Sequence, residues 1–388
     1  YRRHTNFSIE SIRQTFNQQL STGGAGRSVA TITRNGDLLY KTYLVLSDTT
    51  GAVISNDYGH NIINFIDVEI GGQVIDRHYG HFMEAWSELT EPNPTGNRAF
   101  ISGIEATRNQ LINNASSTST NNNLPNMFTK FQRMACAGGV SGSSTTSIDI
   151  NQDIYVPLRF WFCKEPGLAL PLIALQYHEV KIIVNFSEAL HSKGQDLWCD
   201  YIYLDTDERR RFAQVSHEYL IEQVQLNSFA NESGAETYDL NFNHPVKELI
   251  WVLQDDTWNT TGNFRSFHTL KKNYDIDSPS ILLKLNGHDR FEKRKISYFT
   301  NTQTYQYHTG CGIDFQNDIV GPHENKSFTI AVYSFCLKPE EHQPSGTCNF
   351  SRIDTAQLIT DAQIGKESDL SLQVYSINYN VLRIMSGM

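Results

Sequence analysis

The segment Ile154–Phe186 reads IYVPLRFWFCKEPGLALPLIALQYHEVKIIVNF, and its apolar pattern decides the fold. Apolar and polar residues alternate over both of its ends, from Ile154 to Phe162 and from Val180 to Phe186. A period of two places alternate side chains on opposite faces, so each end is predicted to be a strand with one buried face. Pro166-Gly167 and Pro171 lie between the two ends and prevent a helix there. We therefore interpret the segment as two strands joined by a turn, at the centre of a β-sandwich.

The composition favours a two-domain β protein. A chain of 388 residues is too long for one ordinary sandwich and matches two domains of about 150–200 residues. Its 21 Phe and 18 Tyr favour strands, on which flat rings pack well. The formal net charge is −10. Binding to the negatively charged phosphate backbone requires a basic surface, so we expect no direct contact with nucleic acid. No apolar run approaches the ~18 residues of a membrane span, so we expect no membrane insertion.

The six cysteines do not form a metal or redox motif. None of them belongs to a C-x-x-C pair, and Cys163, Cys199 and Cys336 fall within predicted strands. Buried free thiols are therefore favoured over a disulfide framework. This usage indicates assembly in a reducing compartment.

Several short elements are predicted in the first half. Val29–Thr33 and Leu38–Leu46 flank Arg34–Asp37, whose Asn-Gly pair favours a hairpin because both residues tolerate positive φ. Ile62–Ile70 is predicted to be a strand that ends at Gly71-Gly72. The apolar spacing over His78–Leu89 predicts a short amphipathic helix.

A charged run marks the predicted domain boundary. Asp205–Arg211 reads DTDERRR and follows a series of apolar strands. We interpret it as an exposed helical linker whose acidic residues and arginines pair locally, with contact to a neighbouring subunit as an alternative. The boundary predicts an amino-terminal domain over residues 1–210 and a carboxyl-terminal domain over 211–388. Strands of the second domain are predicted at Tyr219–Leu226, Tyr238–Phe242, Glu248–Leu253, Ile281–Leu285, Phe328–Leu337 and Leu370–Ile384.

Two landmarks recur in the same order in the two halves. Val68–Arg77 and Leu283–Arg290 each contain a strand, a glycine turn and then Asp-Arg. Phe160–Pro166 similarly resembles Tyr333–Pro339. These repeats indicate a tandem duplication of one all-β domain. About 16 short strands in two sets fit two eight-stranded antiparallel jelly-roll sandwiches in series, a double jelly roll with a short helical linker.

The stretch Pro166–Val180, PGLALPLIALQYHEV, resembles the signature of the major capsid proteins of nucleocytoplasmic large DNA viruses, of the chlorella-virus type. Further segments agree with that family over the whole chain: Tyr1–Phe7, Arg34–Asp37, Asn241–Pro245, Pro344–Asp354 and Asn380–Met388. The resemblance implies a double jelly roll, a homotrimeric capsomer and an icosahedral shell over an internal membrane. It also implies neighbouring capsomers and minor capsid proteins beneath the shell as partners, assembly in the host cytoplasm, and no cofactor.

The chain departs from the family pattern in two respects. Members usually carry more residues ahead of Tyr1-Arg2-Arg3, so we expect an amino-terminal arm to be missing here. The polar stretches Glu91–Asp153 and Asp255–Asp277 do not match the family, so the resemblance does not predict the features of the outer surface.

No catalytic, cofactor-binding or metal constellation is predicted, and we expect no enzyme. Gly23–Ser28 is glycine-rich but lacks the spacing and the lysine of a phosphate-binding loop. His78 and His81 lie three apart on the predicted helix without a third ligand, so structural histidines are favoured over a metal site. Among the N-x-S/T sequons, Asn114, Asn259 and Asn325 lie in polar stretches and are the candidate glycosylation sites, although chlorella-type relatives carry glycans in unusual sequence contexts.

The favoured function is that of a structural major capsid protein that trimerises into pseudo-hexagonal capsomers. One alternative is a double β-sandwich that binds or processes carbohydrate, which would need paired carboxylates or an aromatic platform in a cleft. A second alternative is a minor capsid or vertex protein of the same fold, which copy number per particle would separate.

Overall fold

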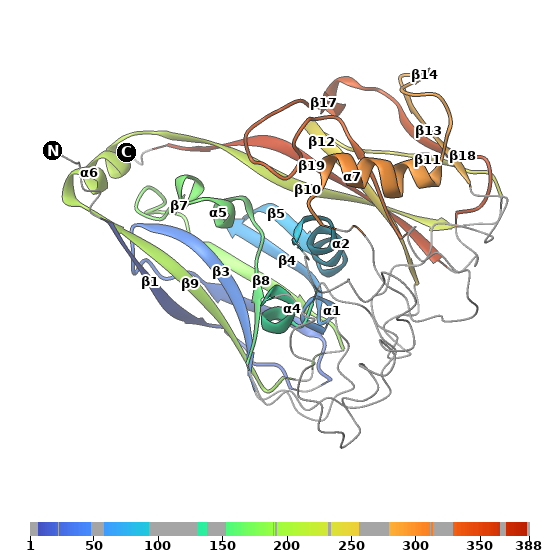
Figure 1. Cartoon of the computed structure of the whole chain (residues 1–388). Helices are drawn as coiled ribbons and strands as arrows, with labels where there is room; N and C mark the ends of the chain where they lie inside the picture. The colour runs from blue at the N-terminus through green and yellow to red at the C-terminus, as the bar shows by residue number, and fades with distance from the viewer. Residues whose placement is uncertain are drawn as a thin grey trace.

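The computed structural model describes residues 7–21, 23–47, 58–92, 130–137, 153–188, 190, 192–231, 234–255, 279–310, 312, 329–364 and 370–385. Within these ranges the chain forms two antiparallel β-sandwiches that lie next to each other (Figure 1). We call them the first roll and the second roll.

The first roll contains two facing sheets. One sheet has the order β1 (Phe7–Thr15), β9 (Gly194–Leu204), β3 (Leu38–Ser47) and β6 (Ile154–Pro157), with the short β7 (Leu170–Pro171) also paired to β3. The other has the order β2 (Gly26–Thr31), β8 (Val180–Phe186), β4 (Ile63–Ile70) and β5 (Gln73–Tyr79).

The second roll is built in the same way. One sheet has the order β10 (His217–Asn231), β19 (Leu370–Ile384), β12 (Pro245–Asp255) and β16 (Ile330–Ser334), with β17 (Cys348–Asn349) paired to β12. The other has the order β11 (Thr237–Asp239), β18 (Ala356–Thr360), β13 (Ser280–Leu285) and β14 (His288–Asp289), with β15 (Arg294–Lys295) paired to β13.

The two rolls share one strand order. Without the short β7, β15 and β17, the strands of each roll can be numbered one to eight along the chain, and the sheets of both rolls then have the orders 1-8-3-6 and 2-7-4-5. Two four-stranded sheets of this kind form a jelly roll, as predicted from the sequence. The predicted repeats occupy equivalent places. One is the hairpin between the fourth and fifth strands, and the other follows the sixth strand.

The hairpin turns of the repeats have the same backbone. Gly71 and Gly72 have φ of +60° and +85°, and Asn286 and Gly287 have φ of +52° and +76°. Two successive residues with positive φ match the right-handed twist of the strands they join, which explains glycine and asparagine there.

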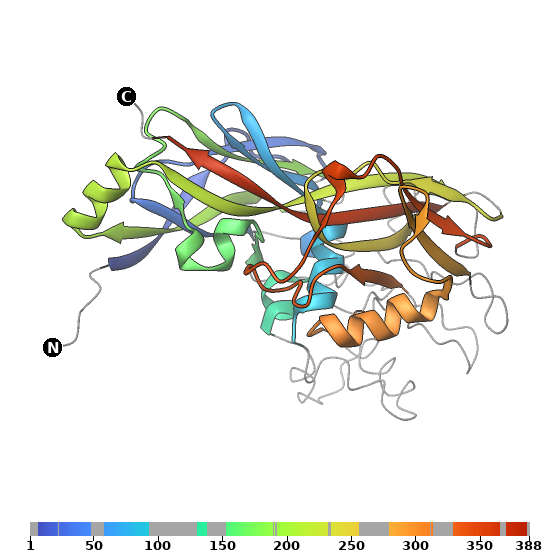
Figure 2. The ribbon, with the colours of Figure 1, turned by 90° about the horizontal axis from the view of Figure 1, so that it is seen from above.

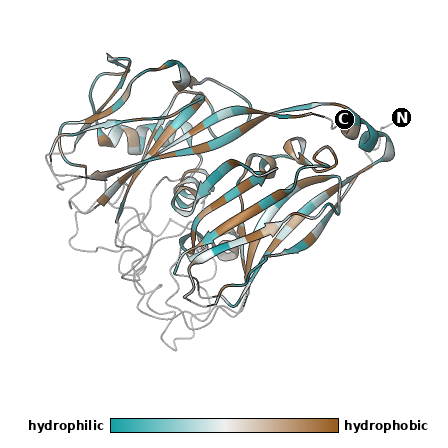
Figure 3. Ribbon diagram, turned by 180° about the vertical axis from the view of Figure 1, so that it is seen from behind, coloured by the Kyte–Doolittle hydropathy of each residue, from teal (hydrophilic) through white to brown (hydrophobic). Residues whose placement is uncertain are grey.

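Each roll has its own apolar core. The residues of β8 that were predicted to face inward, namely Val180, Ile182, Val184 and Phe186, are buried in the core of the first roll. In the second roll, Leu249, Trp251 and Leu253 of β12 are buried in the same manner. Figure 3 shows the resulting bands of apolar and polar residues along the strands.

The predicted continuation of the strand from Ile154 to Phe162 is wrong. The strand β6 ends at Pro157, and Trp161–Lys164 form a helical turn, α5. Phe160, Trp161 and Phe162 are all buried, because a helical turn can direct successive side chains into the core. In addition, β6 and β8 lie in opposite sheets, so the residues between them, including the 3-10 turn η4 (Pro166–Leu168), cross the sandwich and do not close a hairpin.

The predicted hairpin at Arg34–Asp37 is also wrong. The strand β2 pairs with β8 and β3 pairs with β9, so this corner connects two different sheets. Its geometry depends on Asp37, which is buried and whose Oδ2 accepts a hydrogen bond from the backbone N–H of Leu204 at 2.8 Å. The corner also holds the Pro166–Val180 stretch, since the Ile173 N–H donates to the Asp37 carbonyl at 3.2 Å.

Helices α2 (Gly80–Thr90) and α6 (Thr206–Gln214) confirm two predicted helices, with changes in detail. His78 lies on β5, outside the helix that was predicted to include it. The exposed α6 follows β9, but its arginines do not pair only locally. Arg209 Nε lies 2.9 Å from Asp37 Oδ1, so the linker is fixed to the corner of the first roll.

The remaining short elements complete the description: α1 (Tyr58–Asn61), α4 (Lys130–Ala135), the π-helical turn η5 (Tyr298–Thr302), α7 (Gln303–Tyr307) and the 3-10 turn η6 (Phe350–Arg352). No helix in the described ranges has the length and apolar content needed to cross a membrane.

Candidate functional site at the junction of the two rolls

The helix α2 forms the apolar part of the junction. It leaves β5 of the first roll and packs on the outer face of the β10-β19-β12-β16 sheet of the second roll (Figure 1). Phe82, Trp86 and Leu89 are its main contact residues, whereas Met83 belongs to the core of the first roll. They meet the apolar side chains of that sheet: Ile250, Val252, Ile330, Val332, Tyr375 and Ile377. The helix is therefore shared by the two rolls.

The second roll also caps the carboxyl end of α2. The Gly310 N–H donates to the Leu89 carbonyl at 2.7 Å, and the Gly312 N–H donates to the Glu88 carbonyl at 3.0 Å. These carbonyls have no partner within their own helix. The approach requires glycine, since a Cβ on Gly310 would lie 2.3 Å from the Glu88 carbonyl oxygen.

The β10–β19 pair extends from one roll to the other. Both strands have 15 residues, and their register runs without a shift from His217↔Ile384 to Asn231↔Leu370. A strand of this length spans about 50 Å. One end contributes Ile221 and Ile384 to the first core, while the rest belongs to the second roll. Seen from above, the pair crosses both rolls (Figure 2). It therefore restricts hinge motion between them.

A buried charge cluster lies beside α2. Lys247 Nζ lies 2.9 Å from Glu222 Oε1, and Lys164 of the first roll hydrogen-bonds Glu222 Oε2. The Lys247 side chain is 0% exposed and that of Glu222 is 6% exposed. His342 Nδ1 lies 3.2 Å from Glu222 Oε1, outside hydrogen-bond geometry. Burial acts to raise the pKa of Glu222, but Lys164, His342 and Lys247 together hold it well below its ordinary value. Glu222 is therefore a charged link between the rolls.

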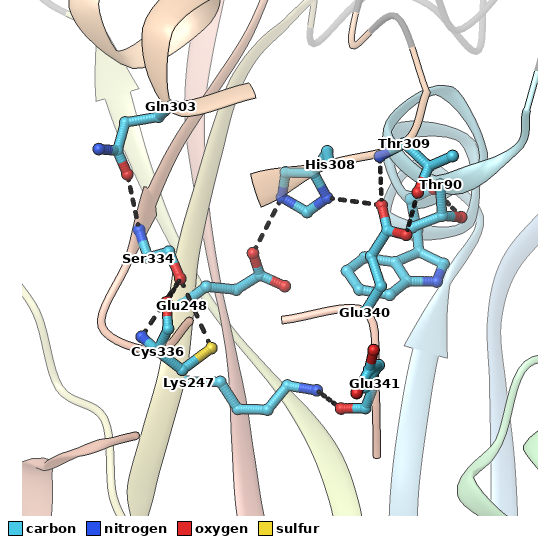
Figure 4. A network of polar contacts seen from close by, with 11 residues as sticks. Thr90, Lys247, Glu248, Gln303, His308, Thr309, Ser334, Cys336, Glu340 and Glu341 are labelled. Carbon is cyan, nitrogen blue, oxygen red and sulfur yellow. Dashed lines mark hydrogen bonds and ion pairs between the residues drawn. The ribbon is translucent and has the colours of Figure 1, made fainter. Parts of the chain in front are cut away.

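A second buried ionic cluster follows α7 and lies within the second roll. His308 Nε2 lies 3.1 Å from Glu248 Oε2, and His308 Nδ1 lies 3.3 Å from Glu340 Oε1 (Figure 4). A ring with carboxylates at both nitrogens must donate from both, so it carries the imidazolium charge. Burial lowers the pKa of His308, but Glu248 and Glu340 outweigh that effect and raise it to about 9. The Trp86 ring lies edge-on to His308, with centroids 6.1 Å apart.

His308 makes stability depend on alkaline pH. Its folded pKa of about 9 exceeds the ordinary value of 6.5, so its contribution is complete below pH 6.5 and is lost as the pH rises through 9. We expect His308→Gln to remove on the order of 3 kcal/mol at pH 6.5 and little above pH 10. Unfolding midpoints of both proteins between these pH values measure the difference.

The exposed His288 provides the control for this experiment. His288→Gln should leave the pH profile of the unfolding midpoint unchanged. If the profiles of the wild type and His308→Gln ran parallel, the assignment of the alkaline transition to His308 would be refuted.

The candidate residues from the sequence fall into two groups. Asn114, Asn259 and Asn325 are outside the described residues, as are Tyr1–Asn6. His78 is on β5 and stacks on Phe160 at 4.4 Å, whereas His81 is on α2 and hydrogen-bonds Gln254 at 2.6 Å. The prediction that both lie on one helix is therefore wrong. No group of three or more metal-ligating side chains occurs within the described ranges.

The sequence analysis missed the ionic residues of the junction. A signal was present, since Lys247 and Glu248 stand next to each other at the start of the apolar run Leu249–Leu253. Successive residues of a strand point to opposite faces of the sheet, so when both faces are packed, two adjacent charged residues are both buried. The burial of Lys247 and Glu248 could therefore be predicted from the sequence, whereas their partners could not.

Comparison with known proteins covers the whole chain. Residues 1–205 match the family model described as major capsid protein N-terminus, and residues 208–388 match the one described as large eukaryotic DNA virus major capsid protein. The chain is 42% identical over 410 residues to the major capsid protein of Pyramimonas orientalis virus, covering 100% of this chain and 91% of that protein. It is 35% identical over 456 residues to that of Paramecium bursaria Chlorella virus 1, covering 100% and 92%. A quasi-atomic model of the PBCV-1 virus capsid matches with a TM-score of 0.71 at 32% identity, covering 100% of this chain and 97% of that one.

Proposed function

Because this chain belongs to the major capsid proteins of large eukaryotic DNA viruses, we propose that three copies close into a pseudo-hexagonal capsomer of the virus shell. The role of the chain is structural and not enzymatic, and its place is the capsid of the virion. Three parts of this proposal go beyond the capsid role that the relatives support. They are trimerisation, contacts with neighbouring capsomers and minor capsid proteins, and assembly in the host cytoplasm.

The shared topology of the two rolls carries the proposal. Two rolls with the same 1-8-3-6 and 2-7-4-5 sheets are fixed to each other by α2, by the β10–β19 pair and by the buried ion pair between Lys164 and Glu222. Three such chains place six similar rolls around one axis, which gives a nearly hexagonal outline. Closed threefold symmetry makes each contact head-to-tail, between different patches of the same chain.

Exposed apolar side chains on both rolls support such contacts. In the isolated chain Tyr177 of the first roll is 73% exposed, and Tyr305 and Leu337 of the second roll are 88% and 75% exposed. A head-to-tail contact needs two unlike patches, and these residues lie on different rolls. Permanent interfaces of this kind bury more than about 2,000 Å².

The oligomeric state tests the proposal. Size-exclusion chromatography with light scattering is expected to give three times the chain mass of 44.1 kDa, without dissociation on dilution to micromolar concentration. A stable monomer at that concentration would count against the capsomer.

The capsid relatives favour this role over a double sandwich that binds or processes carbohydrate. They are major capsid proteins, which also favours the major over a minor or vertex component. Counting copies per particle by quantitative mass spectrometry separates these two. We expect at least hundreds of copies per particle for a major capsid protein. A copy number no larger than the number of vertices would identify a minor or vertex component.

Three finer parts of the proposal have their own support. The five cysteines in the described ranges are free thiols, which fits assembly in the reducing host cytoplasm. The division between residues 210 and 211 falls within α6, between the eighth strand of the first roll and the first strand of the second. Asn114, Asn259 and Asn325 remain the proposed glycan acceptors, and peptide mass mapping of virion protein tests them.

A further inference from the structure

A small cavity lies at the junction, among α2, α5 and β10. Its volume is about 20 Å³. A water molecule needs roughly 10–15 Å³ measured in this way, so the space suits one small occupant. The residues that line it include His78, Arg159, Trp161 and Lys164 of the first roll and Glu222 of the second. The cavity is thus bounded by both rolls.

Buried nitrogens of the lining residues have no hydrogen-bond partner within the described part of the chain. These are Trp161 Nε1, Arg159 Nε and His78 Nδ1. Trp161 is 1% exposed and His78 is 5% exposed. More than about 90% of buried polar groups in folded proteins have a partner. Three exceptions among the residues that line one cavity, two of them obligatory donors, point to an occupant that accepts hydrogen bonds.

The chemistry of these nitrogens restricts the occupant. The indole N–H of Trp161 and the guanidinium N–H of Arg159 can only donate, whereas His78 Nδ1 donates or accepts according to the tautomer of its ring. Arg159 Nη2 hydrogen-bonds Glu91 Oε1 at 2.5 Å, which leaves its Nε–H for the cavity. Lys164 adds a second positive charge to the lining. Among the described residues of the lining, Glu222 is the only carboxylate, and it is already engaged by Lys164 and Lys247.

We propose that the cavity is a binding site for a small monatomic anion of the chloride class, held by Trp161 Nε1–H and Arg159 Nε–H. A water molecule would also accept hydrogen bonds, but it brings two hydrogens that need acceptors in a lining rich in donors. A halide accepts from all sides and brings none. The anion lies beside the cationic side chains of Arg159 and Lys164, between α5 of the first roll and β10 of the second.

A structure of the full-length protein in bromide tests the site directly. We expect an anomalous peak within the cavity, beside Trp161 Nε1, when sodium bromide replaces sodium chloride. Water density there without anomalous signal, or bromide at the surface only, would overturn the proposal. This experiment uses the wild-type protein, so it does not depend on the folding of any variant.

Halide dependence of the unfolding midpoint provides the second test. At constant ionic strength, replacing gluconate, which is too large for the cavity, by about 300 mM chloride should raise the midpoint by about 2–4 °C. Trp161→Phe should abolish this rise, and so should Arg159→Lys, which removes the Nε–H but keeps the charge.

Trp251→Phe is the matched control. Trp251 is also 1% exposed, and its Nε1 also has no hydrogen-bond partner in the described ranges, but it lies in the core of the second roll. Its variant should keep the full chloride response. An equal response in the wild type and in Trp161→Phe would refute the site.

Discussion

Glu222→Leu is expected to lower the free energy of unfolding by about 3–5 kcal/mol. The substitution removes the only carboxylate within reach of Lys247 Nζ in the described ranges, and the Lys247 side chain is 0% exposed. An unpaired buried ammonium keeps its desolvation penalty without the attraction that offset it. Lys164 loses the same partner but is 21% exposed, so it can turn toward solvent. Urea unfolding followed by tryptophan fluorescence measures the loss.

Two variants separate the lost pairing from other effects. Glu222→Leu combined with Lys247→Met replaces the pair by apolar groups and should recover most of the loss, since such replacements are often neutral. Glu218→Leu makes the same change on the same strand, where Glu218 pairs with Arg383 and both side chains are more than 60% exposed. This control should change stability by no more than about 1 kcal/mol. Equal losses in Glu222→Leu and in the double variant would refute the buried-pair explanation.

Glu222 also makes the free energy of unfolding depend on pH in the acid range. The folded pKa of Glu222 lies below its ordinary value of 4.5, so its contribution is present above pH 4.5 and is lost as the pH falls below that value. The difference between the wild type and Glu222→Leu should therefore shrink in acid. Together with His308, whose contribution is complete only below pH 6.5, this places the most stable form of the junction between about pH 5 and 6.5.

Local sequence patterns were sufficient for the two-roll architecture. Alternation identified β8, because one of its faces is buried against the opposite sheet. The paired landmarks identified the duplication, because both hairpin turns need residues that adopt positive φ. Each of these signals comes from residues that are close together in the sequence, and residue periodicity carries information only over such short distances along the chain.

The errors arose where burial was not one-sided. Phe160, Trp161 and Phe162 are buried together, so the apolar run contained no reliable period and the helical turn α5 was missed. At Arg34–Asp37 the Asn-Gly pair indicated a hairpin, but the interactions of Asp37 with Leu204 and Arg209 direct the chain into the other sheet. Those partners are more than 160 residues away in the sequence.

The junction could not have been predicted for the same reason. Lys164 and Glu222 are 58 residues apart, and His308 and Glu248 are 60 apart. The first pair depends on how the two rolls are placed, and the second depends on how distant segments of the second roll meet. No repeat or spacing in the sequence indicates either arrangement. Buried ion pairs of this kind favour one arrangement of the rolls, because any other would leave charges buried without partners.

Trp86→Ala is expected to cost about 3–5 kcal/mol and to loosen one roll from the other. Trp86 is 6% exposed, stacks on Phe82 at 6.0 Å and lies beside His308, so its removal leaves a void where α2 meets the second roll. Hydrogen exchange should therefore accelerate in α2 and at the α2-facing residues Ile250 and Val252 of β12.

Trp251→Ala removes the same side chain from inside the second roll and serves as the matched control. It should be destabilising to a similar degree, but its exchange should accelerate in β13 and β18, which enclose that core, while α2 stays protected. The contrast follows from geometry, because Trp251 and Ile250 are adjacent on β12 and point to opposite faces of the sheet. Wild-type protection of α2 in Trp86→Ala would contradict the assignment of α2 as the helix that locks the two rolls. The proposed capsomer of three chains needs that lock, since a hinge between the rolls would let its outline vary.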